Sequence, residues 1–399
     1  MTKNLKLKKI FKILNFEKDL ASTSALLLAS TVIGGGLGFI STILLSRILN
    51  PHNFGIFKTL TGIYGFAIYF LDFGFQNTLV KYLSEFSAQN QKGKANQLVQ
   101  NLFLLRFVIL IFIIALSLTF RQNIASLFLK NENLSYLIYH TLIFTFVAFL
   151  DLSRAAVIGL QNFQLIAVIN IIVPLASILI LIPLAYFFGL PAAIIGAAAA
   201  YLTGSLVSLG FLFKNKFHQR LKSPFIFPKL VFSYGLPSYF SALPSYIFLA
   251  IIPLLSLFFP QNKVGYFAFS LSFYTVGMVV PGTISQILFP KIAALAAASK
   301  ASAQAALFRA LKIYLPVILF EIIFASAFAK PVILLFAPQF IAAYSLVVIL
   351  VATAAFLGIG TILITYFTAT HKLKIAFCLN FAAGVIFTLV AFIATKVTL

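Results

Sequence analysis

Six ionisable side chains lie inside long apolar stretches of the sequence: Lys58, Asp72, Arg106, Asp151, Arg154 and Glu321. A charge in hydrocarbon is strongly destabilised, so such residues pair, line a wet cavity or carry function. The chain has a single cysteine, Cys378, scattered histidines, and no H-E-x-x-H, G-x-S-x-G or P-loop pattern. We therefore expect no enzyme activity, no metal and no cofactor. Coupling to a gradient of Na⁺ or H⁺ stays open. The six charges are candidates for binding or ion coupling.

One apolar stretch carries small or polar residues at helical spacing. Steps of four, three, four and three positions separate Lys58, Gly62, Gly65, Tyr69 and Asp72. This spacing places the five on one helical face, which favours a cavity or a neighbouring helix over lipid. We predict that Lys58, Tyr69 and Asp72 contribute to substrate binding. Two alternatives stay open: Lys58 can extend to the nearby membrane surface, and Asp72 can simply end its helix.

Three further charges fall near one end of other apolar stretches. Asp151 and Arg154 are three positions apart, so they can pair on one helical face. Arg106 lies roughly 10 Å inside its own stretch by helical rise. We predict that Arg106 contributes to substrate binding and that Asp151 and Arg154 form a charge network, although a purely structural cluster also fits. Glu321, near the middle of a later stretch, is either a protonated packing residue or an ion-coupling site.

The elements that position these residues are membrane-spanning helices. Hydrophobic residues make up 62% of the chain and charged residues 9%, which is not the balance of a soluble protein. Apolar runs of about 20 residues, long enough to cross a bilayer as helix, recur throughout. We predict an all-α polytopic membrane protein with about 11 transmembrane helices. The predicted spans are 20–46, 54–76, 99–120, 134–158, 163–188, 191–213, 231–259, 264–288, 308–328, 342–367 and 375–395.

The net charge of +22 is spread unevenly over the loops between these spans. With the N-terminus in the cytoplasm, most lysines and arginines fall on that side, in agreement with the positive-inside rule. The basic segment 1–19 is typical of an amphipathic helix on the inner leaflet. The positive charge therefore sets the topology, and we expect no nucleic-acid partner.

An internal repeat divides the spans into two halves. The stretch LLSRILNPHNFGIF at 44–57 recurs as LLSLFFPQNKVGYF at 254–267, which indicates a duplication. Because each repeat has six helices, both halves start on the same side and form parallel-repeat lobes. The sixth helix of the second lobe would lie beyond Leu399, so either the chain is truncated or an eleven-helix form exists. The predicted domains are a cytoplasmic N-terminus (1–19), an N-lobe (20–213), a cytoplasmic linker (214–230) and a C-lobe (231–399).

Glycine and proline fall at matching positions in the two halves. The run IGGGLG at 33–38 interrupts the first span, and Gly34 corresponds to Pro244 in the seventh. Interrupted helices at matching positions favour a central transport site, so we predict that Gly34, Gly35 and Pro244 break helices that line a cavity. Close packing of Gly34 and Gly38 against a neighbouring helix is the alternative.

Three stretches carry a resemblance to a known family: LLSRILNPHNFGIFKTL, FLDFGFQNTLVKYLSE and ISQILFPKIAALAA. They resemble the polysaccharide or O-antigen (Wzx-type) flippases of the multidrug/oligosaccharidyl-lipid/polysaccharide (MOP) exporter superfamily. The resemblance implies a V-shaped pair of lobes around a central cavity. It also implies alternating-access transfer of an undecaprenyl-diphosphate-linked oligosaccharide from the inner to the outer leaflet, for polysaccharide or lipopolysaccharide biosynthesis.

The same resemblance implies a place in the bacterial or archaeal plasma (inner) membrane, with membrane lipids and polysaccharide polymerase or export machinery as partners. Cavities in the family are often cationic, so Lys58 and Arg106 match the role of diphosphate partners. Two other functions stay open. One is a cation-coupled multidrug exporter of the same superfamily, and the other is an inactive, truncated membrane protein.

Overall fold

A computed structural model describes residues 2–130, 134–217, 227–370 and 372–399, nearly all of them helical. Apolar side chains face lipid and each other, and an α-helix satisfies its own backbone hydrogen bonds where water is absent. The helices are α1 (Thr2–Asp72), α2 (Phe75–Ala88), α3 (Lys92–Thr119), α4 (Arg121–Phe128), α5 (Ser135–Gly159), α6 (Phe163–Ala176), α7 (Ile182–Lys214), α8 (Phe227–Leu230), α9 (Leu236–Phe258), α10 (Gln261–Gly277), α11 (Val279–Ala298), α12 (Lys300–Phe336), α13 (Tyr344–Ala369) and α14 (Leu373–Thr398). Short segments of tighter or wider helix are η1 (Ser177–Leu181), η2 (Val231–Gly235) and η3 (Pro338–Ala343).

Two helical stretches are long enough to cross the membrane twice, and each is bent in the middle. Ala25–Asp72 bends at Asn50, whose φ is 60°, and Phe163–Lys214 bends at Gly189, whose φ is 71° and ψ −153°. Asn50 accepts a hydrogen bond from the Asn53 backbone N–H at 3.1 Å, as a helix N-cap does. Within the described residues, eight helical stretches are long and apolar enough to span a membrane. When the two bent stretches are each counted as two spans and α9 is added, every span predicted from the sequence corresponds to one helical segment.

The predicted helix breaks at Gly34, Gly35 and Pro244 are wrong. α1 is helical throughout 33–38, and its only non-helical residue is Asn50; the backbone at Pro244 lies inside α9. Gly34 serves packing instead, because a side chain there would meet the Asn170 backbone carbonyl, whereas Gly35 faces open space. Transmembrane helices tolerate proline when neighbouring groups compensate for the lost hydrogen bond.

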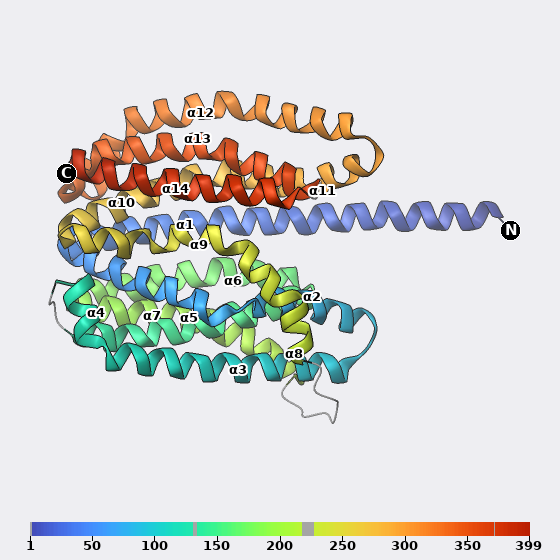
Figure 1. Cartoon of the computed structure of the whole chain (residues 1–399), viewed down its shortest axis with the longest axis horizontal. Helices are drawn as coiled ribbons and strands as arrows, with labels where there is room; N and C mark the ends of the chain where they lie inside the picture. The colour runs from blue at the N-terminus through green and yellow to red at the C-terminus, as the bar shows by residue number, and fades with distance from the viewer. Residues whose placement is uncertain (1, 131–133, 218–226, 371) are drawn as a thin grey trace.

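The helices form two groups with α1 between them (Figure 1). In one group α5 packs against α2 and α7, and α7 also packs against α6. In the other group α13 packs against α10, α11, α12 and α14. α1 contacts α6 on one side and α10 on the other, and α9 contacts both α1 and α14.

The predicted domain bounds stay a prediction. Most of the linker 214–230 lies outside the described residues. The start of the predicted C-lobe does not stay with its own group, because η2 packs against α2. Residues 2–19 of the predicted N-terminal segment are the first part of α1, which extends beyond the two helix groups (Figure 1).

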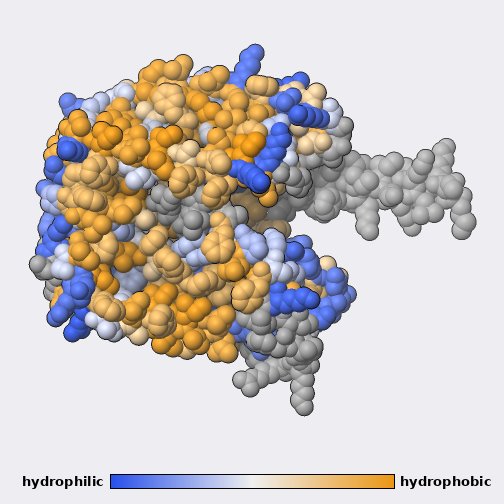
Figure 2. Space-filling view, in the orientation of Figure 1, coloured by the Kyte–Doolittle hydropathy of each residue, from blue (hydrophilic) through white to orange (hydrophobic). Residues whose placement is uncertain are grey.

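The outer flanks of both groups are apolar, as a lipid-facing surface must be. Phe187, Phe188 and Leu319 are large apolar side chains that are exposed, and Figure 2 shows apolar surface across both groups on the visible face. The same view shows the surface hollowed between the two groups, at the end where α2 turns into α3 and α11 into α12. The opposite end has no such opening in this view.

Candidate functional site

The end opposite the hollow is closed by the two copies of the internal repeat. Gly55 from the first copy packs against the Gln261 backbone carbonyl, and Gly265 from the second packs against the Pro51 backbone carbonyl. A Cβ atom at either glycine would overlap these carbonyl groups. The backbones of α1 and α10 therefore touch at equivalent points of the repeat, and only glycine fits there. We call this contact the closed end.

Two glutamines extend the closed end with hydrogen bonds between the helix groups. Gln261, which is buried, accepts from Thr59 Oγ1 at 3.1 Å. Gln339 donates to the backbone carbonyls of Ser46 and Arg47, at 3.1 and 2.5 Å. These amides were not among the residues singled out from the sequence. The available signal was the presence of glutamine beside apolar segments.

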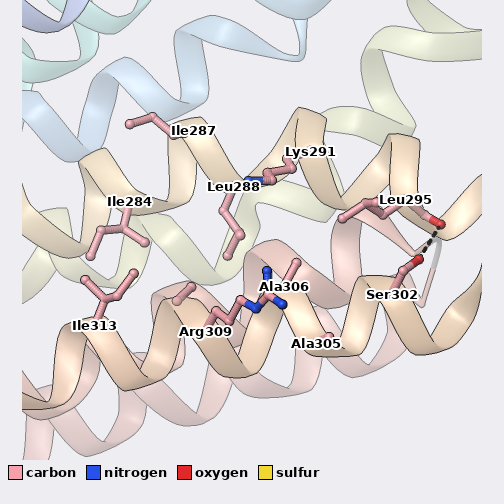
Figure 3. Close-up of a pocket in the computed structure, with 11 residues that line it drawn as sticks. Ile284, Ile287, Leu288, Lys291, Leu295, Ser302, Ala305, Ala306, Arg309 and Ile313 are labelled. Carbon is pink, nitrogen blue, oxygen red and sulfur yellow. Dashed lines mark hydrogen bonds between the residues drawn. The ribbon is translucent and has the colours of Figure 1, made fainter.

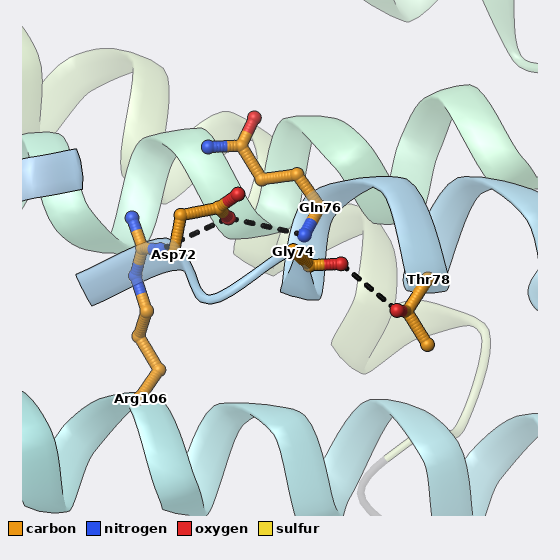
Figure 4. A network of polar contacts seen from close by, with 5 residues as sticks. All are labelled: Asp72, Gly74, Gln76, Thr78 and Arg106. Atoms are coloured by element: carbon orange, nitrogen blue, oxygen red, sulfur yellow. Dashed lines mark hydrogen bonds and ion pairs between the residues drawn. The ribbon is translucent and has the colours of Figure 1, made fainter. Parts of the chain in front are cut away.

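A buried ion pair joins Asp72, at the end of α1, to Arg106 on α3 (Figure 4). Arg106 Nη1 is 3.5 Å from Asp72 Oδ1, with side chains 1% and 7% exposed. Asp72 also accepts from the Gln76 backbone N–H at 3.1 Å, across the turn that Gly74 makes with a φ of 78°. The Gly74 carbonyl accepts from Thr78 Oγ1 at 2.8 Å. Asp72 thus ends α1 and pairs with Arg106 at the same time.

Asp151 and Arg154 join this pair in one network. Asp151 interacts electrostatically with Arg106, Asp72 and Arg154. Arg154 Nη2 donates to Asn170 Oδ1 at 2.7 Å. The four charges come from α1, α3 and α5, and Asn170 of α6 accepts the hydrogen bond of Arg154. We call Asp72, Arg106, Asp151 and Arg154 the charge cluster.

The four predicted substrate-binding residues do not meet at one point. Arg106 and Asp72 are paired, and at 1% exposure Arg106 is shielded from any ligand in this conformation. Tyr69 stacks on Tyr239 of α9, with ring centroids 4.2 Å apart and planes at 15°. Lys58 lies about 21 Å from Asp72 along the helix. Its Nζ sits 5.3 Å from the centre of the Phe54 ring, near the closed end.

Glu321 is separate from the charge cluster. It lies on α12 in the second helix group, and both carboxylate oxygens are buried with no hydrogen-bond partner among the described residues. Tyr314 on the same helix interacts with it electrostatically, while the Tyr314 hydroxyl donates to the Ala355 carbonyl at 3.0 Å.

A buried polar group near Lys58 was missed in the sequence. The Tyr64 ring stacks on His140 of α5, with centroids 4.8 Å apart and planes at 9°. The Tyr64 hydroxyl lies 2.9 Å from Ser117 Oγ, and Thr61 Oγ1 lies 3.4 Å from His140 Nε2. The only sequence signal was the recurrence of Tyr64 as Tyr274 in the internal repeat.

The helix arrangement is similar to that of several solved membrane proteins. It is similar to a structure of the lipid II flippase MurJ in an inward closed conformation, with a TM-score of 0.69 and 15% identity over 93% of this chain and 87% of that chain. An inward-facing multidrug resistance MATE family transporter of the MOP superfamily gives a TM-score of 0.64 and 17% identity over 94% and 98%. The Vibrio cholerae MATE transporter VcmN, as a mutant, gives 0.60 and 14% over 95% and 97%. The fold is that of the MOP superfamily, as the sequence resemblance predicted.

Residues 20–296 match the family model described as polysaccharide biosynthesis protein. The chain belongs to this family. A comparison with curated proteins gave no match.

Proposed function

We propose that the chain is a flippase that moves a lipid-linked oligosaccharide across the membrane by alternating access. Oligosaccharide and diphosphate groups do not cross hydrocarbon unaided, because losing their hydration is prohibitively costly. A protein that performs this transfer has to open a polar path to one side while closing it to the other. Its family, named for polysaccharide biosynthesis, and its similarity to a lipid II flippase support this substrate class.

The observation that carries the proposal is the closed end. The contact joins the two helix groups through Gly55, Gly265 and the Gln261 and Gln339 amides. The hollow between the groups lies at the other end (Figure 2). Glycine packing and a few neutral hydrogen bonds form a contact that can separate without exposing a buried charge, which suits a reversible gate.

Within this proposal, Lys58 is the cation that meets the substrate diphosphate. It lies beside the closed end, and no described carboxylate pairs with it. Arg106 and Asp72 remain proposed substrate contacts, which requires the charge cluster to open during the cycle. Tyr69 would take part after separating from Tyr239.

The test is a leaflet-accessibility assay in proteoliposomes. A fluorescent undecaprenyl-diphosphate oligosaccharide is placed in both leaflets, and a membrane-impermeant quencher reads the outer one. The proposal predicts that the protein increases the quenched fraction beyond the outer-leaflet share. A quenched fraction equal to that of protein-free vesicles, with folded protein present, would overturn it. An imposed Na⁺ or H⁺ gradient shows whether transfer is coupled to either ion.

A second candidate function is cation-coupled multidrug export, and one observation favours it. Glu321 is a buried carboxyl without a hydrogen-bond partner in the described chain, as a proton- or Na⁺-binding residue would be. This function predicts drug resistance on expression and its loss in Glu321→Gln. Oligosaccharide transfer without drug resistance would exclude it.

A further inference from the structure

A cavity of about 500 Å³ lies between α11 and α12, near the turn that connects them. Figure 3 shows Lys291 of α11 and Arg309 of α12 on opposite walls, with Ser302 toward the turn. Farther from the turn the walls are apolar, formed by Ile284, Ile287 and Ile313. The cavity thus has a cationic part and an apolar part, arranged along the helix axes.

No ion pair compensates the two cations within the part of the chain that the structure describes. Neither Lys291 nor Arg309 forms an ion pair with a described carboxylate. The sequence from 279 to 320, which includes α11 and the first half of α12, contains no aspartate or glutamate. Two like charges facing one cavity repel each other, and an anion placed between them removes that repulsion and gains charge-assisted hydrogen bonds.

The internal repeat shows that the surroundings of Lys291 differ between the two halves. The position equivalent to Lys291 is Lys81, whose Nζ lies 4.0 Å from the centre of the Tyr234 ring. In the first half, an aromatic side chain therefore already covers the lysine at the position equivalent to Lys291.

The apolar walls identify the kind of anion. Ile287 and Ile313 are 57% and 65% exposed and lie farther from the α11–α12 turn than the two cations. Arg309 is at the start of the predicted span 308–328, the depth at which lipid headgroups lie. A free phosphate would use the cations and leave the isoleucines without a role. A phospholipid uses both, with its phosphate between Lys291 and Arg309 and its acyl chain along the isoleucines.

We propose that the cavity between α11 and α12 binds the headgroup of an anionic phospholipid. The phosphate lies between Lys291 and Arg309, and the acyl chain follows Ile284, Ile287 and Ile313 into the bilayer. The site lies within the second helix group, near the turn between α11 and α12.

The sequence contains no tryptophan, so one substitution creates a unique fluorophore. Ile313→Trp places it in the apolar part of the cavity. Leu104→Trp on α3 is the matched control, since the two side chains are 65% and 64% exposed and lie at similar distances from the start of their helices. Quenching is measured in vesicles that contain brominated phosphatidylglycerol or brominated phosphatidylcholine with the same acyl chains.

The proposal predicts that brominated phosphatidylglycerol quenches Ile313→Trp at a several-fold lower mole fraction than brominated phosphatidylcholine. Leu104→Trp should be quenched equally by both lipids. Adding Lys291→Gln and Arg309→Gln to Ile313→Trp should remove the preference, and adding Lys291→Arg should keep it. Equal quenching of Ile313→Trp by the two lipids would overturn the proposal without any need for the charge variants.

Two further outcomes would also contradict it. One is a preference for phosphatidylglycerol that survives the double glutamine substitution. The other is displacement of the lipid by inorganic phosphate, but not by KCl of equal ionic strength, which would indicate a free phosphate site. The proposal predicts that phosphate and KCl have the same effect.

Discussion

At the scale of single residues, the structure distinguishes charges that interact with each other from a charge without a described partner of opposite sign. The charge cluster balances two carboxylates against two guanidinium groups within one helix group. Lys58 has no such partner in the described structure and lies beside the closed end. Both kinds of residue looked alike in the sequence. Their difference depends on the Asp72–Arg106 contact, which joins positions 34 residues apart on different helices and leaves no periodic signal.

Arg106→Met should strongly destabilise the protein, because it leaves a buried carboxylate without its main partner. Breaking one side of a buried pair costs about 3–5 kcal/mol. Thermal unfolding in detergent measures the loss, and Arg121→Met, at an exposed site on α4, is the control. Asp72→Asn combined with Arg106→Met should be less destabilised than the two single effects added together. Simple additivity would mean that the pair does not act as a unit.

Lys58→Ala should reduce oligosaccharide transfer while leaving the amount of folded protein unchanged. Lys58→Arg should retain transfer, since the substrate diphosphate needs a cation at this position. Lys330→Ala, which removes an exposed lysine from α12, serves as the control. The measurement is the transfer rate in proteoliposomes at equal protein content. Normal transfer by Lys58→Ala would remove Lys58 from the substrate path.

At the scale of elements, the hydrophobic pattern was sufficient to predict the spans, because each crossing needs its own apolar run of fixed length. The bends were predicted less well. Glycine permits both a bend and a close contact, and the sequence does not distinguish the two. Gly34 packs, whereas the real bend lies at Asn50 and Pro51, inside a predicted loop. The internal repeat was the stronger signal, because its two copies meet at the closed end.

Gly55→Ala should weaken the closed end, because the added methyl group overlaps the Gln261 backbone carbonyl. Overpacking of this kind costs about 1–3 kcal/mol. Gly65→Ala is the control on the same helix, since nothing lies within 4 Å of its Cβ position. In a Cys378→Ser background, Thr59→Cys should react faster with an impermeant maleimide when Gly55→Ala is present and not when Gly65→Ala is present. Equal reaction rates in all three proteins would show that the glycine contact does not control closure.

At the scale of the whole molecule, two groups of helices are joined at one end and separated at the other. The positive-inside rule predicts that the hollow faces the cytoplasm, since the α2–α3 and α11–α12 turns lie in segments expected there. Alternating access then requires the closed end to open and the hollow to close. This cycle is the central claim, and the Thr59–Gln261 contact gives direct control over it.

The most direct measurement is therefore transfer with the closed end locked. Thr59→Cys and Gln261→Cys are introduced together with Cys378→Ser and joined by a short methanethiosulfonate cross-linker. We predict that the cross-linked protein does not transfer the fluorescent lipid-linked oligosaccharide, that reduction restores transfer, and that each single cysteine variant is unaffected by the reagent. Undiminished transfer by fully cross-linked protein would contradict alternating access through the closed end.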